Sequence, residues 1–282
     1  MPAATKTKKA APKKAVSNTS AAKPAKPPAV KKPPVTKERM TVAAVMSFLE
    51  KVGTAQARKI YLRHGMEEPM FGVSFADLGK LQKRIGVDHD LAEQLFATRN
   101  ADAVNLAVKI ADPARMSPED LDRWAGVFKS RMCGGYIAHL TVESPHGRRM
   151  ADQWRSAGDD RRGCAGWNVV GGLAMRDPSV PDAWFAERLG EIERGIHAAA
   201  NRTREAMNMA MISIGGRSPA LHVAALAVAK KVGKVEVDHG ETSCETPDAR
   251  PYLEKMWARA KGGGFPTPAA HEQSRASPRT RC

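Results

Sequence analysis

The sequence has few aromatic residues, few cysteines and no long apolar run. Aromatic residues make up only 5% of its 282 residues, which favours a helical core rich in Ala, Leu and Met over a β-sandwich. The four cysteines are scattered without a C-x-x-C pair, so zinc-ribbon and thioredoxin chemistry lack support and a reducing compartment is expected. No apolar run reaches the roughly 18–20 residues of a membrane span, and no apolar segment of a secretory signal follows the first positive charges. We therefore expect a cytoplasmic protein that makes no contact with membranes.

Acidic residues are absent before Glu38, in a segment dominated by Lys, Ala and Pro, as in "KPAKPPAVKKPP". Proline stops helices, like charges repel, and little in this segment can be buried, so we predict a disordered tail over residues 1–38. A second disordered basic tail is predicted over residues 261–282, where four basic residues accompany Glu272. The net charge of +15 therefore lies mainly in the tails, and the folded domain is predicted over residues 39–260.

The lysines of the N-terminal tail indicate contact with nucleic acid. Such an arm binds polyanions by releasing condensed counterions, and full engagement of its lysines on duplex DNA would give a salt slope of at most about −9. These contacts supply affinity but no sequence specificity, and they favour association with the nucleoid over a merely solubilising role. The ten lysines are Lys6, Lys8, Lys9, Lys13, Lys14, Lys23, Lys26, Lys31, Lys32 and Lys37.

Helix start and stop signals recur from Thr41 onward. "SPED" at 117–120 and "SPAL" at 218–221 place a Ser cap before Pro at the first helical position, and "TPDA" at 246–249 is predicted to do the same with Thr246. "SFADLGKLQKRIG" at 74–86 begins on a Ser cap and ends at Gly86. About a dozen helices are predicted and no strand, so the fold class is all-α.

Three methionines in "NRTREAMNMAMISIGG", residues 201–216, separate the two faces of one predicted helix. At about 100° per residue, Met207 and Met211 share a stripe that is predicted to face the core. Met209 lies about 200° from Met207 and is predicted to face a groove.

Short loops between helices of this length favour antiparallel helix pairs. The segments "ADPARMSPEDLDRW" (111–124) and "RDPSVPDAWF" (176–185) both run from Asp-Pro through a short loop into a Trp-containing helix. This internal echo favours stacked helical pairs, and a helical bundle is the competing architecture.

Three segments, in order, resemble the DNA alkylation repair family of HEAT-like repeat proteins: "MFGVSFADLGKLQKRIG", "MSPEDLDRWAGVF" and "NRTREAMNMAMISIGGRSPALH". The resemblance covers about residues 41–231. It implies a HEAT-like α-solenoid of antiparallel helix pairs whose concave face holds duplex DNA. Characterised members are glycosylases that remove positively charged alkylpurines, and no cofactor is expected. Trp faces attract the cationic base, a carboxylate stabilises the oxocarbenium ion, and Arg holds phosphate.

The resemblance places the family's cleft residues on three positions of this chain. Aligned on "LDRWAGVF", the cleft Trp and the Asp four residues later fall at Arg131 and Gly135. The second cleft Trp falls at Met209, where methionine keeps soft apolar contact but loses the cation–π attraction.

The family's arginine has two candidates, Arg161 and Arg162, although counting back from Ala174 places Cys164 at that position. Trp167 lies on the same predicted helix. Trp167 is either a displaced cleft aromatic or a core residue, and on an apolar helix the core is the commoner place for it.

Three functions stay open at this point. In the first, the protein binds duplex DNA that is alkylated or distorted and acts as an alkylpurine glycosylase with an altered site. Alternatively, it binds DNA without catalysis. The third reading is a protein-binding helical-repeat scaffold with a histone-like basic tail.

The segment "VEVDHGETSCETPDAR" (235–250) gathers carboxylates with His239 and Cys244. These side chains can all bind zinc. No second Cys or His lies at ligand spacing nearby, so we favour a structural role for the loop over a metal site.

Overall fold

Helices account for all the regular secondary structure in the described part of the chain. The computed structural model describes residues 39–127 and 131–281, and the side chains of residues 131–134 lie outside the description. The described residues belong to one compact unit, Arg39–Cys282. The predicted N-terminal tail and its ten lysines lie outside the described residues.

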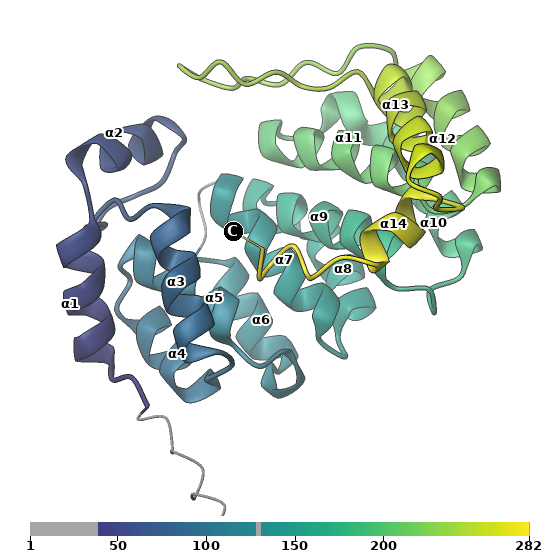
Figure 1. The fold of residues 1–282 in the computed structure, drawn as a ribbon. Coiled ribbons are helices and arrows are strands. Elements are labelled where there is room, and N and C mark those ends of the chain that lie inside the picture. Colours follow the sequence, from purple (N-terminus) through teal and green to yellow (C-terminus); the bar gives the residue numbers. More distant parts are fainter. Residues whose placement is uncertain (1–38, 128–130, 282) are drawn as a thin grey trace, which may run out of the picture. The chain divides into compact units, whose positions relative to one another are not determined.

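Within the described ranges the chain forms fourteen α-helices and two short 3₁₀ helices, drawn in Figure 1, and no strand. None of these helices has the length and apolar character needed to cross a bilayer. In order along the chain they are α1 (Val42–Val52), α2 (Ala55–Arg63), α3 (Phe75–Ile85), α4 (His89–Ala97), α5 (Ala101–Ile110), η1 (Pro113–Arg115), α6 (Pro118–Ala125), α7 (Arg131–Glu143), α8 (Gly147–Arg155), α9 (Asp160–Arg176), α10 (Asp182–Gly195), η2 (Ile196–Ala198), α11 (Asn201–Gly215), α12 (Pro219–Val232), α13 (Ala249–Gly262) and α14 (Pro268–Gln273).

Helix caps follow the sequence signals at most positions. Ser117 and Ser218 accept hydrogen bonds from the first turns of α6 and α12, and Ser74 caps α3, which ends at Gly86. The prediction for α13 was wrong by two residues. Asp248, not Thr246, caps this helix by accepting a hydrogen bond from the Arg250 N–H. Asp satisfies an orphan backbone donor better than Thr, because its carboxylate also interacts favourably with the helix dipole.

Helix α9 lies at the centre of the packing and contacts α7, α8, α11 and α14. Ten of its residues are buried. Two glycines permit the close approach of its neighbours: a Cβ at Gly166 would lie 2.4 Å from the Arg155 nitrogen of α8, and one at Gly172 would lie 2.7 Å from Val142 of α7. Helices that follow one another in the chain also pack together, as in α4 with α5, α8 with α9 and α11 with α12.

The two faces of α11 lie as the methionine spacing predicts. Met207 and Met211 are 4% and 1% exposed and belong to the core. Met209 is half-buried and packs against the edge of that core.

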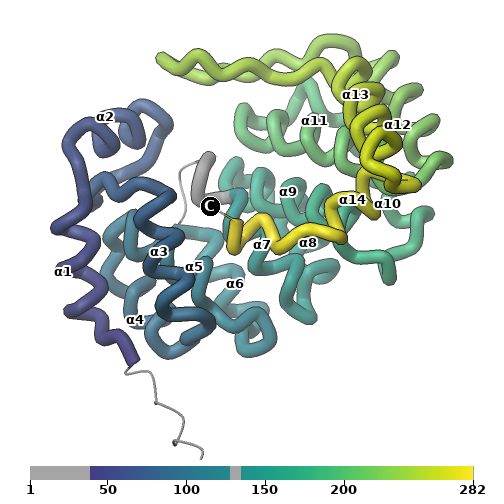
Figure 2. The backbone as a smooth tube through the Cα atoms, in the orientation of Figure 1, coloured from purple at the N-terminus to yellow at the C-terminus, as the bar shows by residue number. Residues whose placement is uncertain are grey.

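The C-terminal segment differs from the disordered tail expected over residues 261–282. Helix α13 continues to Gly262, α14 follows, and the chain then runs on as far as α5, as the yellow tube in Figure 2 shows. Arg279 anchors it and is only 4% exposed. Its guanidinium donates to three backbone carbonyls around the end of α5 and to Glu143 at the end of α7. A count of charged residues cannot predict this anchor, because it treats every arginine as solvated. One buried guanidinium can instead bind several unpaired carbonyls at a helix end.

Candidate nucleic-acid interface

Helices α7, α9 and α11 line one cavity of about 360 Å³ together with the C-terminal segment. Gly135 comes from α7, Trp167 from α9 and Met209 from α11. These are three of the positions that the sequence singled out. They lie far apart along the chain, and the close packing of α7 and α11 on α9 brings them together.

The groups at these positions leave the cavity open and mainly apolar. A Cβ built at Gly135 meets no atom of the described residues within 4 Å, so a side chain would have room beside them. Trp167 is 3% exposed and belongs to the core, as expected for an indole on an apolar helix, although it also lines the cavity. Met209 offers a flexible apolar surface.

His139 also lines the cavity, and sequence reasoning did not single it out as a DNA contact. His139 follows Gly135 by about one helical turn on α7, so helical spacing could have predicted that both residues face the same cavity. Its Nδ1 is buried without a hydrogen-bond partner among the described residues. Burial lowers the pKa of His139 to about 4. The ring is therefore neutral at neutral pH and offers the cavity no positive charge.

A carboxylate enters the cavity from α14 and is surrounded by arginines. Glu272 pairs with Arg176 at 3.2 Å, with Arg281 at 2.5 Å and with Arg275 at 3.5 Å. Arg176 comes from the end of α9, so this cluster holds the C-terminal segment onto that helix. Arg176 and Arg281 line the cavity together with Glu272, so two guanidinium groups outnumber one carboxylate and this side of the cavity carries net positive charge.

Arg162 binds α6, Arg161 binds Gly126 directly after that helix, and neither lines this cavity. Arg162 forms a bidentate pair with Asp122, with both N–O distances at 2.9 Å. The hydrogen bond from Arg162 is the main cause that holds the pKa of Asp122 below its usual range. Arg161 is exposed and donates to the Gly126 carbonyl at 2.6 Å. Arg162 is thus engaged in joining α9 to α6, whereas Arg161 keeps much of its surface accessible.

Arg131 is the first residue of α7, and its side chain lies outside the described residues.

The loop between α12 and α13 runs out and back beside α11, as Figure 1 shows. The Asn201 side chain exchanges two hydrogen bonds of 2.8 Å with the backbone of Asp238. The Asn208 side chain donates to the Pro247 carbonyl. Polar side chains of α11 therefore hold the loop at Asp238 and again at Pro247, shortly before α13 begins.

The same loop contains the two candidate metal ligands. The His239 ring nitrogen Nε2 lies 2.9 Å from the Thr246 hydroxyl, and the Cys244 N–H donates to Thr242. Among the residues that the structure describes, no group of three or more His, Cys, Asp or Glu side chains could hold a metal ion. The structure therefore does not bring His239 and Cys244 into such a group.

The stacked helices resemble those of solved HEAT-like repeat proteins. One such structure, from "a new family of proteins related to the HEAT-like repeat DNA glycosylases with affinity for branched DNA structures", matches with a TM-score of 0.73 at 33% identity. The match covers 80% of this chain and 97% of that one. The protein thus has the all-α HEAT-like fold that the sequence predicts.

The family follows from the sequence itself. A model of the family described as "DNA alkylation repair enzyme" matches residues 45–252. The chain belongs to this family. Uncharacterized proteins of Listeria innocua and Listeria monocytogenes are each 29% identical to it. They align over 70% and 72% of this chain and over 88% and 91% of their own lengths. The match to the family model ends before most of α13, so α14 and the C-terminal segment lie beyond it.

Proposed function

We propose that this protein binds DNA through the face formed by α7, α9 and α11, and that it recognises distorted or branched DNA without excising a base. Its family supports the DNA-binding part of this proposal. The affinity for branched DNA that is stated for the structural relative supports the choice of substrate.

The observation that carries the proposal is that Gly135, Trp167 and Met209 line one cavity. The resemblance assigns two of these positions to cleft residues of the family, so the chain keeps the place of the cleft while changing its chemistry. An apolar cavity offers contact to an exposed base or sugar. Distorted DNA presents such groups at a lower unstacking cost than an intact duplex does.

The carboxylate of the cavity argues for binding over base excision. Stabilising an oxocarbenium ion requires a negative charge aimed at the sugar. Glu272 is the acid that lines the cavity, and three arginines already surround it. Gly135 stands where the resemblance places the family's Asp. The positive charge around Glu272 suits phosphate contact better than it suits a cationic alkylpurine.

Two further contacts belong to this proposal. Arg161 is exposed at the start of α9 and is available to a phosphate. The lysines of residues 1–37 are proposed to add affinity that depends steeply on salt.

The test is binding of the full chain to an intact duplex, a four-way junction and a duplex containing 7-methylguanine, at one salt concentration. We expect the junction to bind at least about tenfold more tightly than the intact duplex. The same samples, heated in alkali, report abasic sites, and we expect none above the protein-free control. Equal binding of all three would remove the structure-specific part of the proposal, and base release would replace it with a glycosylase function.

A further inference from the structure

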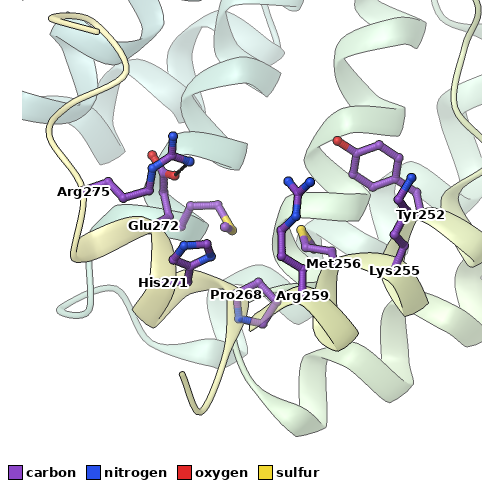
Figure 3. Close-up of a pocket in the computed structure, with 9 residues that line it drawn as sticks. Tyr252, Lys255, Met256, Arg259, Pro268, His271, Glu272 and Arg275 are labelled. Carbon is purple, nitrogen blue, oxygen red and sulfur yellow. Dashed lines mark ion pairs between the residues drawn. The ribbon is translucent and has the colours of Figure 1, made fainter. Parts of the chain in front are cut away.

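A second cleft lies mainly beyond the matched family region, between α13 and the segment that contains α14, with Met175 and Tyr252 as its lining residues inside that region. It has a volume of about 380 Å³, and Figure 3 shows its lining. Tyr252, Lys255 and Arg259 extend from α13 on one side, and Arg275 extends from the other. Apart from Tyr252, these residues follow the end of the family match. The cleft is therefore a second candidate site besides the cavity of α7, α9 and α11.

One face of α13 presents the three side chains together. Tyr252, Lys255 and Arg259 stand at positions i, i+3 and i+7, which fall on one side of a helix. The opposite face is fixed in the core, because Leu253 is fully buried and the Trp257 indole donates to the Gly215 carbonyl at 2.8 Å. The exposed face is thus held on a rigid element.

Positive charge dominates this cleft. Lys255 and Arg259 are exposed and form no ion pair with any other residue that the structure describes. The Arg275 side chain is 53% exposed and lies 3.5 Å from Glu272, which it shares with Arg176 and Arg281. Glu272 also lines the cleft, so three cations face it against this one carboxylate.

Tyr252 gives the cleft an aromatic surface. It is 44% exposed and is the one aromatic residue among the large apolar side chains that are exposed in the described ranges. An exposed aromatic ring beside Lys and Arg on a rigid element is the arrangement that binds single-stranded nucleic acid, because bases stack on the ring while cations hold the phosphates. A duplex keeps its bases stacked inside and offers them to no such ring.

We propose that this cleft binds a single-stranded segment of DNA, with phosphates on Lys255, Arg259 and Arg275 and one unstacked base on Tyr252. The inference rests on the proposed function and deepens it, because branched DNA can carry single-stranded arms next to its duplexes. The cavity of α7, α9 and α11 then contacts the duplex, and the cleft binds the single-stranded arm.

The test uses the full chain, so that the lysine-rich segment is the same in every sample. Three probes are compared: a blunt duplex, the same duplex with a single-stranded thymine arm, and the thymine strand alone. The variants are Y252A and K255A/R259A. The matched control is K83A/R84A, which removes the same two charges from exposed positions on α3.

We expect the wild-type protein to prefer the armed duplex over the blunt one. Y252A should weaken binding of the armed duplex by at least about fivefold, which corresponds to the loss of one stacked base. K255A/R259A should lower the salt slope measured on the thymine strand by about 1.4. Neither variant should change binding of the blunt duplex by more than the control does.

The outcomes separate this inference from the proposed function. If the variants match the control on every probe, the cleft proposal is overturned while duplex binding still stands. If they weaken blunt and armed duplex equally, the cleft is part of a duplex interface and the single-strand proposal is overturned. If the wild-type protein binds no duplex but binds the thymine strand through these residues, the cleft proposal holds and the proposed function fails. Binding of none of the probes would overturn both.

Discussion

Arg279 should hold the C-terminal segment in place, and replacing it with Ala tests how strongly. Its Nη1 donates to the carbonyls of Val108, Lys109 and Ala111 at 2.9, 2.8 and 3.2 Å. Its Nε and Nη2 donate to Glu143 at 2.9 and 2.7 Å. R279A leaves Glu143 with the Ser277 hydroxyl as a donor but without its cationic partner. It also leaves the three carbonyls without this donor, in a place where the Arg279 side chain is only 5% exposed.

The magnitude follows from burial and charge. Removing one partner of a buried ion pair costs about 3–5 kcal/mol. The Glu143 side chain is 23% exposed and can regain some water, so the lower end applies. We expect a loss of about 3 kcal/mol in the free energy of unfolding, which for a domain of this size lowers Tm by about 6–12 °C. R279K should recover only part of this loss, because one ammonium cannot serve both the carbonyls and the carboxylate.

Urea and thermal unfolding of the full chain measure the effect. R275A is the matched control: it removes an arginine from the same segment, but one that is 53% exposed, with its carboxylate partner 3.5 Å away. Its cost should stay below about 1 kcal/mol. A loss of less than about 1 kcal/mol for R279A, or equal losses for the two variants, would refute the reasoning that this arginine is the anchor.

Three other predictions concern α7 and α9. R162A should lower the free energy of unfolding by about 1 kcal/mol at neutral pH. Because Arg162 lowers the pKa of Asp122, this loss should disappear as the pH falls through the pKa of Asp122 in the folded state. Unfolding measured from neutral to acid pH tests this, and a loss that persisted in acid would contradict the pairing. Burial lowers the pKa of His139 to about 4, so the unfolded state binds a proton on this ring at a higher pH than the folded state does. The free energy of unfolding should therefore fall by at most about 3 kcal/mol between pH 6.5 and 4. H139L should flatten this part of the pH dependence, and an unchanged slope would mean that other groups cause it. G135A should stabilise the protein by about 0.5–1 kcal/mol because its Cβ enters open space among the described residues. G172A should destabilise it because its Cβ would lie 2.7 Å from Val142. If urea unfolding gave changes in stability of the same sign for both variants, this would count against the packing of α7 on α9.

Local chemistry explains which features the sequence predicted. Ser74, Ser117 and Ser218 cap their helices because capping needs only a hydroxyl and the next few residues of the same chain. The burial of Met207 and Met211 and the partial exposure of Met209 follow from helical spacing alone. The α13 cap was displaced because Thr246 and Asp248 both offer a suitable acceptor, and spacing does not choose between them.

Long-range contacts explain what the sequence did not predict. Arg279 finds its partners about 136 and 170 positions away in the chain, and composition alone favours a disordered tail there. Arg162 was predicted as a DNA contact, and its pairing with Asp122, forty positions away, was not predicted. The cavity itself depends on how α7 and α11 pack on α9, which no local pattern encodes.

The central claim is that the cavity formed by α7, α9 and α11 contacts DNA, and M209E tests it most directly. This variant adds a negative charge at the cavity, and V223E adds the same charge to α12 at a position that is 68% exposed and does not line the cavity. Binding of the full chain to a four-way junction is measured for both, with thermal unfolding as the check that each variant folds. We predict that M209E weakens junction binding by at least about tenfold and V223E by less than about twofold. Equal binding by two folded variants would contradict the account and place DNA contact elsewhere on the chain.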